Sequence, residues 1–434
     1  MKYNLSNLSI FAWAPGTFTL LLCAPILLSV LLLIPAPVSA TEEVRIDGVL
    51  HIQNGATPSQ GTETLALQEL WRAGGEDDEV IFGVIAQVLG DDDHNLYLLD
   101  SQLSEVQVFS EDGEYVHSLS REGDGPGEAR NPGNLLFFPD GSLGLVQRFP
   151  GKVIKIDLEG NPMVDLTPGG SDPTAGGFLA LADGRIGGDN VVLGCVGISI
   201  DQDTQSQNRT CYVAGFDAEG QETVRYQELS YSWSRTGLTM TEQQMFYIWQ
   251  RWNVTGDGKV LVPSSWNDYS INVYNPDGSL DRVIEREYSS YRRTDDDPGL
   301  AQFIFDRIAE QIATQGITGD FVVEDHEPDI GSIHVAPDQT IWILSSHGAR
   351  PQDEEIMAVY DVFDPVGVFI KQVAVPCEGD ALRDGLFFVG DDRIVVVTGF
   401  IDAVMMQIGG GAGGGLATAE EDAAPMEVIC YEIE

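Results

Sequence analysis

Paired turn signals recur along most of the chain, and their spacing is the feature that most limits its possible folds. Gly141 is followed 19 positions later by Gly160, and Gly258 is followed by Gly278 after 20 positions. Short alternating apolar runs, typical of β-strands, lie between the turns. Units of about 45 residues with four antiparallel strands are typical of a β-propeller blade, because radial packing shields the strand edges.

Six such units can be traced, so we predict an all-β protein, a six-bladed β-propeller with four-stranded antiparallel blades. The other turn pairs are Asp93 with Gly113, Gly184 with Gly220, Asp338 with Gly367, and Asp391 with the closing segment Glu427 to Ile433. The expected strands include 96–99, 106–109, 153–156, 271–274, 341–344 and 394–397. The last unit lacks an outer strand. We expect Leu67 to Arg72 to supply it, because this pairing removes two free strand edges.

Residues 1–40 have the features of a signal peptide, and residues 41–434 are expected to form the propeller. The stretch from Phe18 to Ile34 is almost wholly apolar, Lys2 precedes it, and small residues lead up to Ala40, the expected cleavage site. An uncleaved membrane anchor is the alternative, because about 17 apolar residues approach the length that spans a bilayer. After cleavage we expect a periplasmic or secreted protein with no stable membrane insertion.

The charge balance excludes one large class of partners. The chain has 23 Lys and Arg residues against 68 Asp and Glu residues, so its net charge is 23 − 68 = −45. Nucleic acid binding requires a dense basic surface, and anionic lipid also attracts cations, so neither is an expected partner. A hydrophobic content of 43% is nevertheless sufficient for a folded core.

The cysteines after the signal peptide are even in number, which favours disulfides in an oxidising compartment. Cys195 and Cys211 flank a polar run, and a hairpin between them would let the two sulfur atoms face each other. Cys377 and Cys430 are then the remaining pair. Zinc is the alternative, but no CxxC motif exists and no histidine lies near these cysteines in the sequence, so structural disulfides are favoured.

Several motifs resemble those of bacterial exported six-bladed β-propeller proteins related to NHL repeats. These are Arg121 to Glu128 (REGDGPGE) followed by Asn131-Pro132, Leu98 to Asp100 with Val108 to Gly113, and Ile46 to Asn54. The resemblance covers roughly residues 44–400 and is strongest in the first two units. It implies the fold and the compartment but no reaction, since most members have no assigned function.

The long insertions are expected to lie on one face of the propeller. They are 199–210, 231–250, 286–329, 347–355 and 398–425, and all fall in second-to-third-strand loops or between blades. Loops on a rigid scaffold commonly carry function, although neutral drift would also produce insertions. A helix in the 286–329 insertion, capped by Asp297 and ended by Gly316, is expected to act as a lid over a cavity or as a cap on the blade ends. A flexible glycine-rich loop is expected at about 402–425.

Five residues on this face are candidates for ligand binding. They are Arg148, Trp266, Asn267, His347 and Arg350. An arginine, an aromatic ring and a histidine around one cavity would suit an anionic or sugar-like ligand. Each alone is more commonly a surface or packing residue.

Two functions are compatible with these patterns, and whether the protein is an enzyme is left open. The first is an exported, non-enzymatic binding scaffold without a cofactor, whose partner is a small molecule, a glycan or a protein. The second is a metal-dependent lactonase or lyase with a site in the central channel, which would hold a divalent ion such as calcium. Asp91, Asp93 and Asn95 match the start of a calcium loop, but a solvated turn explains them better because Leu96 replaces the required glycine. We favour the binding scaffold.

Overall fold

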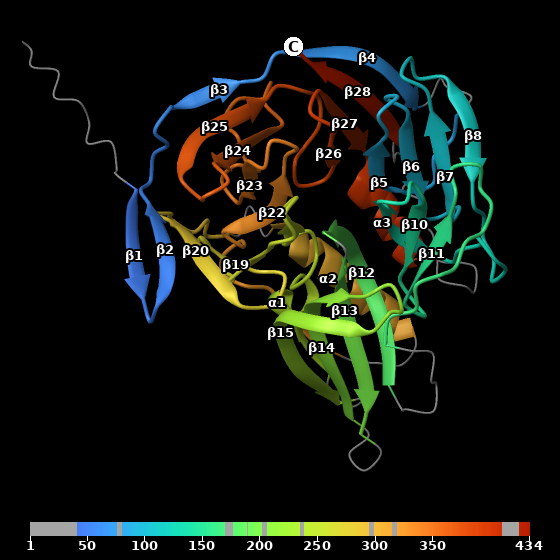
Figure 1. Ribbon diagram of the computed structural model, residues 1–434, viewed down its shortest axis with the longest axis horizontal. Helices are drawn as coiled ribbons and strands as arrows, with labels where there is room; N and C mark the ends of the chain where they lie inside the picture. Colours follow the sequence, from blue (N-terminus) through green and yellow to red (C-terminus); the bar gives the residue numbers. More distant parts are fainter. Residues whose placement is uncertain are drawn as a thin grey trace, which may run out of the picture. The chain divides into compact units, whose positions relative to one another are not determined.

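Among the described residues, six β-sheets of three or more strands succeed one another along the chain and are arranged around a common centre (Figure 1). The computed structural model describes residues 41–75, 80–169, 177–188, 190–201, 206–234, 238–294, 299–314, 319–409 and 425–434. All of them belong to one compact unit, Val38–Glu434. Each of these six sheets is one blade, and the expected six-bladed β-propeller is confirmed; the sheet of blade 2 has three strands among the described residues. The signal peptide expected at residues 1–40 lies outside the described residues.

Within a blade the strands are antiparallel and mostly consecutive in sequence, with the first strand nearest the centre. Blade 1 contains β5 (Ile85–Gly90), β6 (Leu96–Asp100), β7 (Glu105–Phe109) and β8 (Tyr115–Leu119), and blade 2 contains β9 (Pro132–Phe137), β10 (Leu143–Gln147) and β11 (Lys152–Ile156). Blade 3 contains β12 (Gly177–Gly187), β13 (Asn190–Ile200), β14 (Ser206–Phe216) and β15 (Glu222–Ser234), and blade 4 contains β17 (Asn253–Val254), β18 (Val260–Pro263), β19 (Ser270–Tyr274) and β20 (Leu280–Arg286). Blade 5 contains β22 (Ile330–Val335), β23 (Ile341–Ser345), β24 (Ala358–Phe363) and β25 (Phe369–Val375), and blade 6 contains β26 (Gly385–Val389), β27 (Arg393–Thr398) and β28 (Glu427–Ile433). Every strand run expected from the sequence is present.

The hydrophobic core is divided into clusters between neighbouring blades. Among the described residues there are six such clusters, one for each pair of adjacent blades around the ring. Alternate residues of a strand point to opposite faces of its sheet. In β27, Ile394 and Val396 therefore pack toward blade 5, whereas Val395 and Val397 pack toward blade 1. This double burial explains why the central strands of the blades are apolar on both faces.

The N-terminal segment runs along the outer edges of three blades, from blade 4 to blade 6 (Figure 1). The hairpin of β1 (Glu42–Ile46) and β2 (Val49–Asn54) extends blade 4, where β2 pairs in parallel with β20. Next, β3 (Thr62–Thr64) pairs in parallel with β25 of blade 5. Finally, β4 (Leu67–Gly74) pairs antiparallel with β28 and completes blade 6. The expected closure by Leu67 to Arg72 is confirmed, and the contacts with blades 4 and 5 were not expected.

The insertions lie on the face expected for them, beside the second-to-third-strand loops and the connections between blades. They contain β16 (Leu238–Thr241), β21 (Gly319–Val322), α1 (Glu242–Met245), α2 (Gly299–Thr314) and α3 (Phe400–Gly409). The 199–210 insertion mainly lengthens β13 and β14. The expected helix in the 286–329 insertion is α2, which packs on α3; its expected caps, Asp297 and Gly316, lie outside the described residues.

The loop expected at 402–425 begins as a helix instead. Ala403 and Met405 of α3 are buried, and Ala403 joins the core between blades 6 and 1. Phe400 and Val404 also pack against this core, and the helix continues to Gly409. Residues 410–424, which include most of the glycine run, lie outside the described residues. No helix in the described part of the chain is long and apolar enough to cross a membrane.

The two expected disulfides are wrong, because all four cysteines of the described residues are free thiols. The hairpin around the polar run forms, but its register places Cys195 opposite Tyr212 and Cys211 opposite Val196. This offset of one residue turns the two side chains to opposite faces of the sheet. Cys195 packs between blades 2 and 3, and Cys211 packs between blades 3 and 4.

The second pair is separated in the same way. Cys430 belongs to the core between blades 6 and 1, whereas Cys377 packs against the core between blades 5 and 6. The Cys377 sulfur atom lies 3.6 Å from the sulfur of Met357. Burial raises the pKa of the Cys430 thiol to about 11 and that of the Cys377 thiol to about 12, so both stay protonated at neutral pH.

Candidate functional site

A cavity of about 330 Å³ lies at the centre of the ring, where the first strands of all six blades contribute side chains. Residues from the insertion-bearing face also line it. Arg148 comes from the loop between β10 and β11, Trp249 and Gln250 come from the connection between blades 3 and 4, and Phe400 begins α3. The channel cavity therefore lies at the insertion-bearing end of the central channel, and its volume is within the usual range of small-molecule sites.

Backbone and amide contacts hold the loop that carries Arg148. The Gln147 side chain accepts a hydrogen bond from the Arg130 N–H at 2.9 Å and donates one to the Pro150 carbonyl at 2.9 Å. The Leu181 N–H donates to the Arg148 carbonyl at 2.9 Å, which ties the loop to blade 3. Gly133 leaves the space that the guanidinium occupies, since a Cβ atom at position 133 would lie 2.5 Å from Arg148 Nε.

The guanidinium of Arg148 has no anionic partner among the described residues. Its Nε atom is buried and makes no hydrogen bond to any described residue, and the centroid of the Trp249 ring lies 5.6 Å from its central carbon. Burial lowers the pKa of Arg148, because desolvation disfavours its charge. An unpaired and largely desolvated cation is costly unless a ligand supplies the missing anion.

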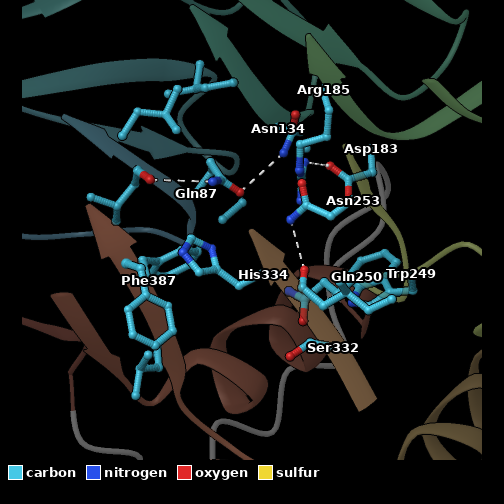
Figure 2. Close-up of a pocket in the computed structure, with 18 of the residues that line it drawn as sticks. Gln87, Asn134, Asp183, Arg185, Trp249, Gln250, Asn253, Ser332, His334 and Phe387 are labelled. Atoms are coloured by element: carbon cyan, nitrogen blue, oxygen red, sulfur yellow. Dashed lines mark hydrogen bonds and ion pairs between the residues drawn. The ribbon is translucent and has the colours of Figure 1, made fainter. Parts of the chain in front are cut away.

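The remaining charges of the cavity compensate each other. Asp183 and Arg185 both belong to β12, and their side chains form an ion pair at 2.5 Å (Figure 2). Asp183 also accepts the Gly184 N–H at 2.8 Å, and Arg185 donates to the Gly184 carbonyl at 2.6 Å. Asp183 is the one carboxylate among the lining residues, so Arg148 leaves the described cavity with an excess positive charge.

Amide side chains form the next part of the wall. Asn134 Nδ2 donates to Gln87 Oε1 at 3.2 Å, which links blade 2 to blade 1 (Figure 2). Asn134 Oδ1 is buried and has no hydrogen-bond partner among the residues that the structure describes. The Asn253 amide is occupied by the backbone, since its Nδ2 donates to the Ile333 carbonyl at 2.9 Å and its Oδ1 accepts the Val254 N–H at 2.8 Å.

Aromatic side chains form the wall contributed by blades 5 and 6. His334 stacks on Phe388 with ring centroids 4.6 Å apart, and Phe388 also meets the rings of Trp342 and Tyr360 edge-on at 5.2 Å. Burial lowers the pKa of His334 to about 4, with a smaller contribution from Arg185. The imidazole is therefore neutral at neutral pH and adds no charge to this wall.

A divalent metal does not fit the donors of this cavity. Hard cations require several oxygen ligands, including carboxylates. Asp183 is engaged by Arg185, the Asn253 amide is engaged by the backbone, and Arg148 would repel a cation. Across the described ranges there is no group of three His, Cys, Asp or Glu side chains that could hold a metal ion. The segment that resembles the start of a calcium loop forms the expected turn, because Asp91 Oδ1 accepts hydrogen bonds from the N–H groups of Asp93 and Asn95.

The five residues singled out in the sequence do not form one site. Arg148 lines the channel cavity, whereas His347 and Arg350 line a second cavity of about 430 Å³ between the end of β20 and the β23–β24 loop. His347 is exposed, and its Nε2 lies 2.9 Å from the Ser289 carbonyl oxygen. Arg350 forms an ion pair with Glu327 at 2.9 Å.

The other two candidates lie apart from both cavities. Trp266 is buried beneath the guanidinium of Arg251, 4.7 Å from its ring centroid, and its Nε1 donates to the His326 carbonyl at 3.1 Å. These contacts describe a packing residue. Asn267 is exposed in the loop between β18 and β19. The pair is therefore near the insertion-bearing face but lines neither cavity.

Comparison with known proteins agrees with the fold. The family profile DUF5128, described as a six-bladed β-propeller, matches residues 76–165. The chain is a six-bladed β-propeller. No curated protein sequence matches this propeller.

Solved structures that resemble this propeller are distant from it in sequence. A Bacteroides fragilis protein described as a candidate exported protein is 12% identical, with 88% of this chain and 99% of that chain covered at a TM-score of 0.46. Virginiamycin B lyase from Staphylococcus aureus is 8% identical, with 85% and 100% covered and a TM-score of 0.40. Regucalcin from Agrobacterium tumefaciens, a calcium-binding protein, is 11% identical, with 86% and 95% covered and a TM-score of 0.40.

Sequence reasoning missed most of the residues that line the propeller's cavity. Asn134, Arg185, Asn253, His334 and Phe387 all belong to the first strands of their blades. The turn pairs locate these strands approximately, so the positions nearest the axis could have been singled out from the repeat. Trp249 offered no such signal, because it lies in an irregular connection between two blades.

Proposed function

We propose that the protein is an exported, non-enzymatic binding propeller that takes a small anionic molecule into its central channel from the insertion-bearing face. The observation that carries this proposal is the guanidinium of Arg148 in the channel cavity, which has no anionic partner in the described part of the chain. The protein carries a net charge of −45, which repels anions at long range. An uncompensated cation inside the cavity attracts an anion locally. A planar guanidinium is well suited to hold a carboxylate or a phosphate through two hydrogen bonds.

Calorimetric titration of the purified protein with acetate, benzoate, sulfate and inorganic phosphate tests this proposal. At least one anion should bind at a single site, and Arg148→Gln should weaken that binding about tenfold or more, because a charged hydrogen bond is lost. Arg45→Gln is the matched control, since it removes the same charge from exposed strand β1. Failure of all four anions to bind, or equal binding by Arg148→Gln, would overturn the proposal.

Metal content distinguishes the binding scaffold from a metal-dependent lactonase or lyase. The proposal expects anion binding that is unaffected by dialysis against a chelator. A stoichiometric divalent ion whose removal abolishes a lactonase or lyase activity would favour the enzyme instead.

Export is the second part of the proposal, and it is supported by the apolar stretch of residues 18–34. When the full chain is expressed in a Gram-negative host, the protein recovered from the periplasm should begin at Thr41 by intact mass. A periplasmic or membrane-bound product that retains residues 1–40 would show that the segment is an uncleaved anchor.

A further inference from the structure

The two sides of the channel cavity differ in chemistry. Blades 2 and 3 supply a polar wall that contains Arg148, Asn134 and the Asp183–Arg185 ion pair. Blades 5 and 6, with α3, supply an aromatic wall that contains Phe387 and further rings. The ring-bearing residues of this wall are His334, Tyr360, Phe387, Phe388 and Phe400. Figure 2 shows Phe387 and His334 on one side and Asn134, Asp183 and Arg185 on the other.

We infer that the ligand of this channel is an aryl carboxylate, with its carboxylate on Arg148 and its apolar ring against the aromatic wall. This inference rests on the proposed anion-binding function and names the chemical class of the ligand. Apolar surface that leaves water on binding contributes to affinity, and aromatic rings favour stacked or edge-on contacts with one another.

The charge of the cavity favours a singly charged ligand. Among the described lining residues, Arg148 is the cation without an acidic partner, because Arg185 is already neutralised by Asp183. A monoanion therefore leaves the cavity close to neutral. A dianion such as phosphate would bring a second negative charge into a partly desolvated site, where an uncompensated charge is costly.

The described residues of the aromatic wall carry no charge that would attract a second polar group. His334 stacks on Phe388 and is neutral at neutral pH, while Leu386 and Val88 add aliphatic surface beside the rings. A ligand that is charged at both ends would leave one end against this wall. The cavity volume of about 330 Å³ accommodates one aromatic ring on a short chain.

The test is a calorimetric comparison of acetate, benzoate and 3-phenylpropionate with phenyl phosphate and inorganic phosphate. The dissociation constant should fall about tenfold or more from acetate to 3-phenylpropionate, because the added ring is removed from water. Phenyl phosphate should bind more weakly than 3-phenylpropionate. Equal binding of acetate and 3-phenylpropionate, or tighter binding of either phosphate, would overturn the inference while leaving anion binding at Arg148 intact.

Two variants test whether the aromatic wall provides the higher affinity for 3-phenylpropionate than for acetate. Phe400→Ala on α3 and Phe387→Ala on β26 should each reduce the preference for 3-phenylpropionate over acetate at least threefold while acetate still binds. Phe303→Ala is the matched control, since Phe303 lies on α2 and does not line the cavity. Phe400 lies outside the blade strands, so its variant tests the wall even if the Phe387 variant fails to fold. An unchanged preference in Phe400→Ala would overturn the assignment of this wall.

Discussion

Cys430 in β28 lies opposite Trp71 in β4, so the last strand of the chain completes its blade by pairing with a strand from the beginning. Trp71 is 9% exposed and stacks on Phe109 of blade 1 with ring centroids 5.8 Å apart. Its Nε1 donates to the Glu111 carbonyl at 3.1 Å. The same side chain therefore joins the borrowed strand to the next blade and closes the ring.

Trp71→Ala should lower the free energy of unfolding by about 3–5 kcal/mol, because it leaves a large cavity between blades 6 and 1. Urea denaturation measures the change. Gln68→Ala, on an exposed position of the same strand, should change stability by less than about 0.5 kcal/mol. Similar losses in both variants would show that the effect comes from the strand and not from the ring contact.

The free thiols lead to a second prediction. Alkylation of unfolded, unreduced protein should label Cys195, Cys211, Cys377 and Cys430, because their side chains lie in separate parts of the core. A reducing agent should leave the melting temperature unchanged, since none of the four described cysteines forms a crosslink that restricts the unfolded chain. Protection of Cys195 and Cys211 together from alkylation would contradict the observed register.

A chain of buried ion pairs anchors the insertion that contains α2. Arg293 donates to both carboxylate oxygens of Glu242, at 2.6 and 2.7 Å, and to Glu327 at 2.9 Å. Arg350 reaches the same Glu327 oxygen at 2.9 Å. The network joins the connection between blades 3 and 4 to the insertion and to blade 5.

Glu242→Gln should destabilise this region by about 3 kcal/mol, because Arg293 stays buried with half of its charge compensation removed. Hydrogen exchange should become faster in residues 286–294 and 319–329 than in the blade strands. Asp325→Asn, an exposed change in the same insertion, is the control. Uniformly faster exchange across all blades would mean that the network supports the whole propeller.

His334 should make stability depend on pH in the acidic range. Burial lowers its pKa from 6.5 to about 4 in the folded protein, so the unfolded chain binds a proton that the folded chain does not. The contribution of His334 to the free energy of unfolding is therefore greatest above pH 6.5, and up to about 3 kcal/mol of that contribution is lost as the pH falls toward 4.

His334→Asn removes this titration and isolates it from the effects of the many acidic residues. The difference in unfolding free energy between wild type and variant should shrink or reverse between pH 7 and pH 4.5, measured by urea denaturation at each pH. A difference that stays constant over this range would show that His334 is solvated.

The sequence was informative about the candidate site only in part. Arg148 and His347 both follow a second blade strand, so their loops could be placed on one face of the ring. The distance of a loop residue from the propeller axis leaves no pattern in the sequence. The sequence therefore did not show that the two residues line different cavities. Several of the missed channel-wall residues, such as Asn134 and His334, belong to first strands, whose turn spacing can be read from the sequence, whereas Trp249 and Phe400 lie outside these strands.

The sequence by itself determined the blade number, the strands, the closing strand and the position of the insertions. Turns that contain glycine or aspartate depend on the local backbone conformation, and apolar runs indicate buried strands. Both features therefore depend on residues that are close together in the sequence. Only the tertiary structure decided the pairing of β2 and β3 with blades 4 and 5, because backbone hydrogen bonds at a strand edge are largely independent of side-chain identity. The tertiary structure also decided that Cys195 and Cys211 stay unpaired. The register between β13 and β14 offsets them by one residue, which places the two sulfur atoms on opposite faces of the sheet.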